Sequence, residues 1–337
     1  MSEQRIYVAY TGGTIGMRPT DGGYAPEPGY FERRLRECPE FLVPQMPSFE
    51  VHEYAPLLDS ADMSPDDWLR IAQDVEHNYD RFDGFVVVHG TDTMAFTASA
   101  LAFMLEGLGK PVVLTGSQIP FGEIRNDARN NLLAAFELAA DSRLCEVVVA
   151  FDELVMRGCR TRKLDASGLS AFASPNCPPL GRIGSRIELE ADRLRQAESG
   201  PLRVQPVGQP VVGAMRLFPG MRASVLENML KPPLEGMVLG AFGVGNGPIH
   251  DGDFLRVLRE ASERGVVIVA TTQCARGRVD LTSYATGRAL ADAGVVGGAD
   301  MTPEAALAKL HYLLNKGLEP AEVREAIGRD LRGELTA

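Results

Sequence analysis

Two threonines with the potential to act as nucleophiles follow short apolar segments of the sequence. Thr14 lies in the run TGGTIG, directly after the apolar segment 6–10. Thr91 lies in the run HGTDT, directly after the apolar segment 85–88. In an α/β protein the loops at the carboxyl ends of parallel strands face the ligand crevice. We therefore expect these two hydroxyls to share one site.

A threonine hydroxyl becomes a good nucleophile only when a base takes its proton. The sequence offers Lys163, in a basic loop after the apolar segment 146–151. A basic loop is usually a solvated surface, but a lysine can act as a base where burial disfavours its charged form. Asp92 could simply cap the helix that follows it. As a neighbour of Lys163 it would favour the charged amine, so the two could work as a coupled proton relay. Backbone amides of the glycine-containing loops could hold an oxyanion, and the set suits acyl transfer at an amide carbonyl.

The glycines of TGGTIG also permit a second interpretation, a cradle for the phosphates of a nucleotide. A dinucleotide fingerprint needs three glycines and then a helix whose amino terminus faces the pyrophosphate. Here Thr11 stands where the first glycine would be, and the next segment, 18–29, is rich in proline and glycine, which break helices. We therefore expect no cofactor at this loop. We interpret 18–29 as a mobile flap with Tyr24 near its middle, although Tyr24 could equally be an aromatic residue packed on the surface.

Composition excludes several functional classes. The chain has 337 residues, 45% of them hydrophobic and 23% charged, and a formal net charge of −11. This length suits one large or two ordinary domains. The negative charge argues against binding a polyanion, so no nucleic-acid partner is expected. No apolar stretch is long enough to span a bilayer, and the amino terminus lacks the apolar core of a secretion signal.

The cysteines and histidines give no sign of a metal site. The five cysteines are scattered without metal-ligand spacing, which is typical of thiols in a reducing cytoplasm. The five histidines are also dispersed, and none belongs to a motif such as HExxH. His89 adjoins the second threonine, but a histidine at a strand end is commonly a core residue. We expect a cytoplasmic protein without a metal.

Strand-like and helix-like segments alternate in the first part of the chain. This alternation predicts an α/β fold, with a parallel sheet covered by helices on both faces. The expected strands cover 6–10, 49–55, 85–88, 111–114 and 146–151, and the expected helices cover 30–38, 64–79, 94–105 and 127–139.

A second, smaller α/β unit is expected after a weakly patterned connection. The predicted boundaries are 1–190 for the amino-terminal catalytic domain, 191–210 for the linker and 211–337 for the carboxyl-terminal domain. The expected strands of the second unit cover 211–217, 236–241 and 266–271, with helices at 224–230 and 254–263 and two or three closing helices within 283–329.

Small polar residues also follow the second expected strand, at Asp59, Ser60 and Ala61. Each of these residue types is common in turns. A helix start at Ser64, with proline next and acids in the first turn, follows closely. The turn becomes a candidate binding element only if the other strand-exit loops converge on it.

Taken together, TGGTIG and HGTDT resemble the two signature motifs of the bacterial-type L-asparaginases. The flap tyrosine, the Asp59–Ser60 turn and Lys163 also fall where that family has functional groups. The similarity runs over nearly the whole chain, including GVGN at 243–246 and LRGEL at 331–335, and it is strongest to the cytoplasmic type I branch. Two separate motifs in the right order and context are far more specific than either alone.

The resemblance implies a mechanism in which Thr14 attacks the side-chain amide carbon of asparagine. Ammonia leaves, and water hydrolyses the resulting β-aspartyl ester. Tyr24 would close over the substrate and polarise Thr14, while Thr91, Asp92 and Lys163 would manage the proton and activate water. The resemblance leaves open whether Thr14 or Thr91 attacks in each step.

Substrate contacts follow from the same resemblance. Asp92 would meet the substrate ammonium through a charge-assisted contact. Ser60 would hold the α-carboxylate, helped by the backbone of the turn at Ala61. Asp59 would have to face the ammonium and avoid the carboxylate.

The resemblance also implies a flavodoxin-like first domain and an intimate homodimer, usually paired into a tetramer, with sites shared between neighbouring subunits. Some type I relatives bind a second asparagine near the dimer interface. Arg162 and Gly240 do not provide the hydroxyl and guanidinium donors usual there, and an unpaired ligand carboxylate would weaken such a site. We expect weak or absent activation by asparagine.

Three other interpretations fit the sequence less well than an asparaginase. The amidase subunit of a tRNA-dependent amidotransferase shares these motifs but carries an extra domain before the first one, and here that motif begins at residue 11. A non-catalytic amino-acid-binding sensor would be expected to lose Thr14, Thr91, Asp92 or Lys163, and all four are present. A dehydrogenase would need the helix that is missing after TGGTIG.

Overall fold

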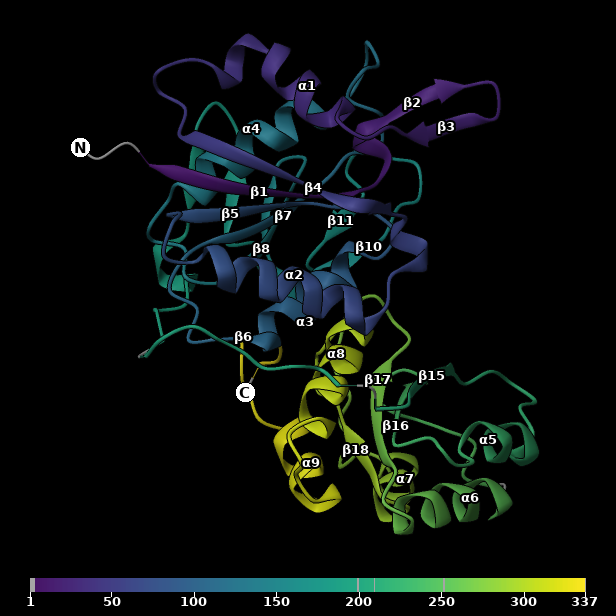
Figure 1. The fold of residues 1–337 in the computed structure, drawn as a ribbon. Helices are drawn as coiled ribbons and strands as arrows, with labels where there is room; N and C mark the ends of the chain where they lie inside the picture. Colours follow the sequence, from purple (N-terminus) through teal and green to yellow (C-terminus); the bar gives the residue numbers. More distant parts are fainter. Residues whose placement is uncertain (1–3, 199, 209, 251, 337) are drawn as a thin grey trace. The chain divides into compact units, whose positions relative to one another are not determined.

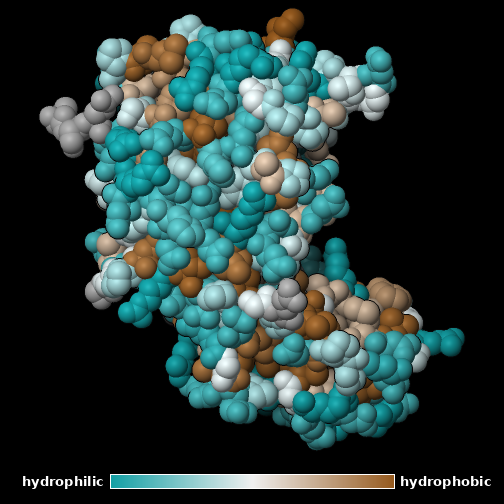
Figure 2. Space-filling view, in the orientation of Figure 1, coloured by the Kyte–Doolittle hydropathy of each residue, from teal (hydrophilic) through white to brown (hydrophobic). Residues whose placement is uncertain are grey.

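A computed structural model shows the fold of the chain and describes residues 4–198, 200–208, 210–250 and 252–336 (Figure 1). The chain forms two compact units, one ending at Gln205 and the other beginning at Pro206. The segment 191–205, expected to be linker, is attached to the first unit, where the Arg195 amide donates to Glu146 Oε1 at 2.9 Å. Hydrophilic side chains cover most of the face drawn in Figure 2. Among the described residues, every helix is too short or too polar to cross a bilayer.

The first unit is built on an eight-stranded sheet with the order β13-β12-β9-β8-β7-β5-β1-β4. The strands from β8 to β4 in that order pair in parallel, and the remaining pairs are antiparallel. The parallel strands are β1 (Arg5–Gly12), β4 (Ser48–Leu58), β5 (Gly84–Val88), β7 (Val112–Thr115) and β8 (Val147–Phe151), and the antiparallel ones are β9 (Leu154–Arg157), β12 (Gly181–Ile183) and β13 (Ile187–Leu189). This arrangement confirms the predicted α/β class, and its parallel part has the flavodoxin-like order. The antiparallel extension was not predicted, because its strands are too short to show periodicity.

Helices cover both faces of this sheet, as Figure 1 shows. Side chains of β1 alternate between the faces. Ile6, Val8 and Tyr10 are fully buried in the core that includes α1 (Tyr30–Glu37) and α4 (Ala128–Ala139). On the other face lie α2 (Pro65–Asn78) and α3 (Met94–Met104), and the Tyr7 hydroxyl donates to Asp74 of α2 at 2.8 Å.

The chain changes direction across the sheet at β1, which lies between β4 and β5. In sheets of this order the ligand crevice lies outside the carboxyl ends of the strands at that reversal. Thr14 follows β1 and Thr91 follows β5. The topology therefore places both predicted threonine loops at the crevice.

The predicted flap is a β-hairpin, which Figure 1 shows projecting from the first unit. A single 3-10 turn, Thr14–Gly16, leads into β2 (Met17–Thr20), which pairs antiparallel with β3 (Gly23–Pro26). No long helix follows the TGGTIG loop, as predicted. Gly23 has φ +108°, a conformation that favours glycine and lets the hairpin turn tightly.

Two pairs of two-residue strands complete the first unit. They are β10 (Arg162–Lys163) with β11 (Phe172–Ala173), and β6 (Leu105–Glu106) with β14 (Arg203–Val204). The first pair fixes the backbone at Lys163, because the register sets this residue opposite Phe172.

The second unit has a parallel four-stranded sheet, which confirms the predicted smaller α/β domain. Its order is β15-β16-β17-β18. The strands are β15 (Val212–Arg216), β16 (Gly236–Ala241), β17 (Val267–Thr272) and β18 (Val295–Gly297), and the helices are α5 (Ala223–Met229), α6 (Gly252–Glu263), α7 (Ala285–Asp292), α8 (Pro303–Leu314) and α9 (Pro320–Ile327). Strand β18 lies in a segment that was expected to hold only helices; three residues were too few to be recognised.

A buried ion pair fixes the end of the second unit. The Lys309 and Glu334 side chains are both 0% exposed, and Nζ lies 2.5 Å from Oε1. Lys309 also donates to the Ile327 carbonyl at 3.0 Å, while Glu334 accepts from the amides of Leu331 and Arg332. Burial is the largest single influence and would raise the pKa of Glu334, but the Lys309 ammonium and the hydrogen bonds to the carboxylate together outweigh it and lower the pKa.

We predict that Lys309→Met lowers the free energy of unfolding by about 3–5 kcal/mol, because it leaves the Glu334 carboxylate buried without its cation. In the native protein the folded-state pKa of Glu334 lies below the unfolded-state value of 4.5. The stabilisation by this pair is therefore complete above that value and is lost as the pH falls through it toward the folded-state pKa. Denaturant unfolding at pH 7 and at pH 4 measures both effects. Equal stability of variant and native protein at pH 7 would contradict the predicted loss of unfolding free energy in Lys309→Met.

Candidate active site

A cavity of about 290 Å³ opens at the carboxyl ends of the parallel strands of the first unit. Of the residues predicted from sequence, Thr14, Asp59, Ser60, Thr91 and Asp92 line it. The remaining lining residues are Gly13, Met17, Gly90, Gln118, Ile119, Ala166 and Ser167. The wall is mostly small and polar, which suits a small polar ligand.

The loops around this cavity are in backbone contact, and glycine makes that contact possible. Gly13 has φ +92°, and a Cβ added there would lie 2.5 Å from Gly90 Cα. A Cβ added at Gly90 would lie 2.5 Å from Ser60 Oγ. Both separations are shorter than real Cβ contacts. The loops that carry Thr14, Ser60 and Thr91 can therefore meet only because two glycines have no side chain.

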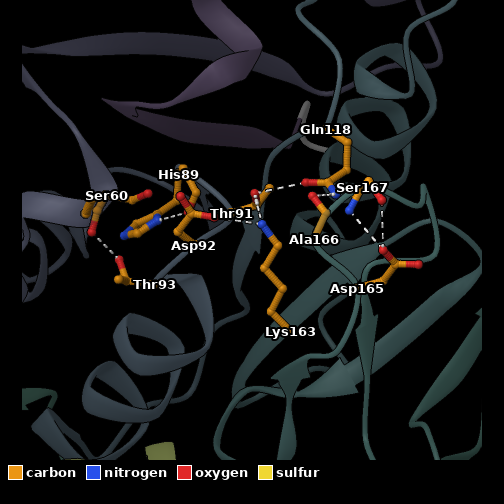
Figure 3. Close-up of polar contacts among 12 residues, drawn as sticks. Ser60, His89, Thr91, Asp92, Thr93, Gln118, Lys163, Asp165, Ala166 and Ser167 are labelled. Carbon is orange, nitrogen blue, oxygen red and sulfur yellow. Dashed lines mark hydrogen bonds and ion pairs between the residues drawn. The ribbon is translucent and has the colours of Figure 1, made fainter.

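Lys163 connects two of the predicted catalytic residues, as Figure 3 shows. Its Nζ lies 2.8 Å from Thr91 Oγ1 and 2.8 Å from Asp92 Oδ1. The Lys163 side chain is only 16% exposed, whereas that of Asp92 is 68% exposed. The amine is thus held in the protein at the threonine hydroxyl, and the carboxylate remains open to a ligand.

Gln118 completes this group, and sequence reasoning missed it. Its Nε2 donates to the carbonyls of Ala166 and Gly168 at 3.2 and 3.1 Å. Because carbonyls only accept hydrogen bonds, they fix the orientation of the amide and turn Oε1 toward Thr91, 3.0 Å away. The Thr91 hydroxyl must then donate to Gln118 and accept from Lys163.

His89 is a structural residue. It is buried, its Nδ1 lies 2.6 Å from the Gly90 carbonyl, and its Nε2 lies 2.9 Å from Thr97 Oγ1. Burial lowers the pKa of His89 to about 4, so the ring is neutral at neutral pH. Nδ1–H then donates to Gly90 and Nε2 accepts from Thr97. The ring holds the strand end beside Thr91 without facing the cavity.

Three of the predicted residues, Tyr24, Ala61 and Lys163, are not among the residues that line the cavity. Tyr24 is half exposed, and its hydroxyl donates to Glu123 Oε1 at 2.9 Å. This hydrogen bond to the carboxylate raises the pKa of the phenol. The Ala61 amide donates to Asp59 Oδ1 at 2.9 Å and is thus already bonded within its own turn.

In the described part of the chain, no three His, Cys, Asp or Glu side chains form a cluster of the kind that could hold a metal ion. A threonine hydroxyl bonded to a lysine amine, beside a second threonine at the edge of a parallel sheet, instead indicates an α/β enzyme that attacks a carbonyl group.

Comparison with known proteins identifies the family. The profile of the family described as "Asparaginase, N-terminal" matches residues 5–195, and that of "Glutaminase/Asparaginase C-terminal domain" matches residues 211–327. The chain is 51% identical over 336 residues to L-asparaginase 1 of Escherichia coli (strain K12), covering 100% of this chain and 99% of that protein. The crystal structure of L-asparaginase I from Vibrio cholerae has 49% identity and a TM-score of 0.93, with 100% of both chains covered. The L-asparaginase structure from Thermococcus kodakarensis has 34% identity and a TM-score of 0.90, covering 99% of this chain and 100% of that one.

The chain therefore belongs to the asparaginase family of amidohydrolases. The family resemblance inferred from the two threonine motifs is confirmed.

We predict that Gly13→Ala lowers amidohydrolase activity by about 100-fold, since relieving the overlap with Gly90 must displace the loop by about an ångström. Gly220→Ala is the matched control, because Gly220 also has positive φ, +84°, but nothing lies within 4 Å of its added Cβ. Both variants carry the backbone strain of about 1–2 kcal/mol. Thermal unfolding and ammonia release would separate the two effects, and equal activities in the two variants would contradict the steric argument.

Proposed function

We propose that this enzyme hydrolyses L-asparagine to L-aspartate and ammonia through an acyl-enzyme on Thr14. The observation that carries the proposal is the hydrogen-bonded group Lys163–Thr91–Asp92, in which Thr91 and Asp92 line the same cavity as Thr14. The 51% identity to an L-asparaginase over the full chain supports the substrate.

In the first half-reaction Thr14 Oγ1 attacks the side-chain amide carbon of asparagine. The threonine proton leaves with the departing nitrogen, which is released as ammonia, and a β-aspartyl ester forms on Thr14. In the second half-reaction water attacks this ester, its oxygen becomes part of the aspartate carboxylate, and the proton returns to Thr14. Free backbone amides of the two glycine loops suit the negative charge of both tetrahedral intermediates.

Lys163 and Thr91 handle the proton in this scheme. In the resting geometry the Thr91 proton points to Gln118 and away from Lys163. The Thr91 hydroxyl therefore rotates before it can pass a proton to Lys163, which can accept that proton only as the uncharged amine. Asp92 compensates the lysine charge at each stage, so that the pair acts as one unit.

Substrate recognition follows from the free polar groups of the cavity. The exposed carboxylate of Asp92 is suited to the substrate ammonium, and the Ser60 hydroxyl to the α-carboxylate. Asp59 keeps one oxygen on the Ala61 amide, so Ala61 contributes by shaping the turn. The second oxygen of Asp59 is available to the ammonium.

Tyr24 acts in this proposal after a movement of the hairpin. Its hydroxyl is bonded to Glu123, so that bond must break before Tyr24 can reach Thr14 and polarise it. The half-exposed ring loses little packing when it moves.

We further propose a homodimer or a dimer-of-dimers tetramer in the cytoplasm. The similarity to type I asparaginases supports the assembly, and the scattered cysteines of the sequence suit a reducing compartment. A non-catalytic sensor and a tRNA-dependent amidotransferase subunit are not favoured, because the complete reactive group is present and the chain is 51% identical to an L-asparaginase over 336 residues.

We predict that Thr14→Ala lowers turnover of L-asparagine by more than about 10³-fold, because no acyl group can be carried. Lys163→Met should lower it by about 10²–10⁴-fold through loss of proton transfer. Both variants should retain the circular dichroism spectrum of the native protein. Ammonia release from asparagine and glutamine measures the rates, and mass spectrometry of a quenched reaction should locate the added aspartyl group on Thr14. Native rates in Thr14→Ala would remove that residue from the mechanism.

We also predict a hyperbolic dependence of rate on asparagine concentration. Arg162 provides no hydroxyl, and Gly240 has no side chain to bind the carboxylate of a second asparagine. Initial rates over a wide substrate range would show this, fitted with a Hill coefficient of about 1. A clearly sigmoidal curve would mean that other residues form an activating site.

A further inference from the structure

The loop between β7 and α4 carries Gln118, and two side chains of the α4 region bind its backbone. Asp127 Oδ2 accepts from the Gln118 amide at 2.9 Å, and Asp127 Oδ1 accepts from the Ile119 amide at 3.0 Å. Asn131 Nδ2 donates to the Gly116 carbonyl at 3.0 Å. The loop is thus held at three points from one helix end.

Asp127 occupies the position just before α4, where aspartate normally caps a helix. Here its side chain makes no capping hydrogen bond, and both of its oxygens are used on the loop. The helix therefore lacks a side-chain cap, while the loop gains two hydrogen bonds to a carboxylate. Hydrogen bonds to a charged acceptor are stronger than those to a neutral one.

Asn131 holds the Asp127 carboxylate in place. Its Nδ2 donates to Asp127 Oδ2 at 3.2 Å, and its Oδ1 accepts from the Asp152 amide at 3.0 Å. Asn131 is 2% exposed, so this orientation is fixed by buried partners. Neither Asp127 nor Asn131 lines the substrate cavity, whereas Gln118 and Ile119 do.

We propose that Asp127 is a positioning residue for the reaction: it fixes the backbone of Gln118 and thereby the point from which the Gln118 side chain reaches Thr91. This inference rests on the proposed function of Thr91. Asp127 acts from behind the loop, through Gln118, and its effect reaches the reacting groups along the path Asp127–Gln118–Thr91.

Two variants separate positioning from folding. Asp127→Asn keeps the shape of the side chain but has only one acceptor oxygen. The backbone amides of Gln118 and Ile119 each need one, so one of them loses its partner. Asp127→Ser restores a residue that caps helices well, with an oxygen that cannot serve both amides. We expect kcat to fall by about 10–100-fold in both, with KM changed by less than about 3-fold, because a displaced catalytic group costs rate without removing substrate contacts.

Asp141→Asn is the matched control. Asp141 lies just beyond the other end of α4, and its carboxylate accepts from the Arg143 amide at 3.0 Å. It is not among the residues that line the cavity. This variant should lose the charge that pairs with the Arg143 side chain, keep one oxygen for the Arg143 amide, and retain native kcat.

A double-mutant cycle with Gln118→Ala tests the route. If Asp127 acts through Gln118, adding Asp127→Asn to Gln118→Ala should lower kcat by less than about 3-fold further. Additive losses would overturn the proposal, as would native kcat in both Asp127 variants.

Amide hydrogen exchange tests the same proposal without a measurement of enzyme activity. Asp127→Asn should speed exchange in a peptide covering 116–121 and leave the turn at 141–144 unchanged. Unchanged exchange at 116–121 would overturn the positioning role. If the native enzyme released no ammonia from asparagine, the proposed function would fail, while the exchange result would still decide whether Asp127 holds the loop.

Discussion

Two loops touch backbone to backbone where Gly13 meets Gly90, and the reactive groups of the site are arranged around that contact. The flavodoxin-like strand order brings the ends of β1 and β5 side by side, but adjacency of strands alone leaves room for side chains between the loops. Removing the side chain at both glycines lets Thr14 and Thr91 face one small cavity. The chemistry therefore depends on a steric condition that a single added methyl group breaks.

The directions of the hydrogen bonds are a second constraint on the site, because they fix how its side chains are oriented. The carbonyls of Ala166 and Gly168 fix Gln118, Gln118 fixes the Thr91 proton, and Lys163 is left to donate to the hydroxyl oxygen. Each step follows from which atoms can only accept or only donate. The resting arrangement keeps Thr91 protonated, so in the proposed mechanism its hydroxyl must turn before it takes part in proton transfer.

The sequence alone was sufficient for those parts of the site that depend on local pattern. Thr14 and Thr91 could be predicted because each follows a recognisable strand, and parallel strands end at one edge of a sheet. Lys163 was expected in a loop after the fifth strand, but it lies in the two-residue strand β10, beyond the antiparallel strand β9. Gln118 could not be predicted, since its role depends on carbonyls about fifty residues further along the chain, at Ala166 and Gly168.

Other features were hidden for the same reason or because they were too short. Charged side chains are usually exposed, so nothing in the sequence indicated that Lys309 and Glu334 would be buried. The fold brings them together as a buried ion pair. Strand β18 and the antiparallel strands beyond β8 were missed because a few residues carry no periodicity. In each case, contacts between distant parts of the chain determine the structure, and the local sequence pattern does not show them.

The contacts that hold the flap differ in kind from those that hold the catalytic loops. Arg18 pairs with Glu27 at 2.6 Å, but both side chains are more than 40% exposed, and such pairs contribute little in water. Tyr24 is likewise bonded at the surface. The catalytic loops, by contrast, are fixed by a buried histidine and by close glycine backbone. The exposed bond between Tyr24 and Glu123 costs little to break, so the hairpin could move as the proposed role of Tyr24 requires without disturbing the buried histidine or the glycine contact.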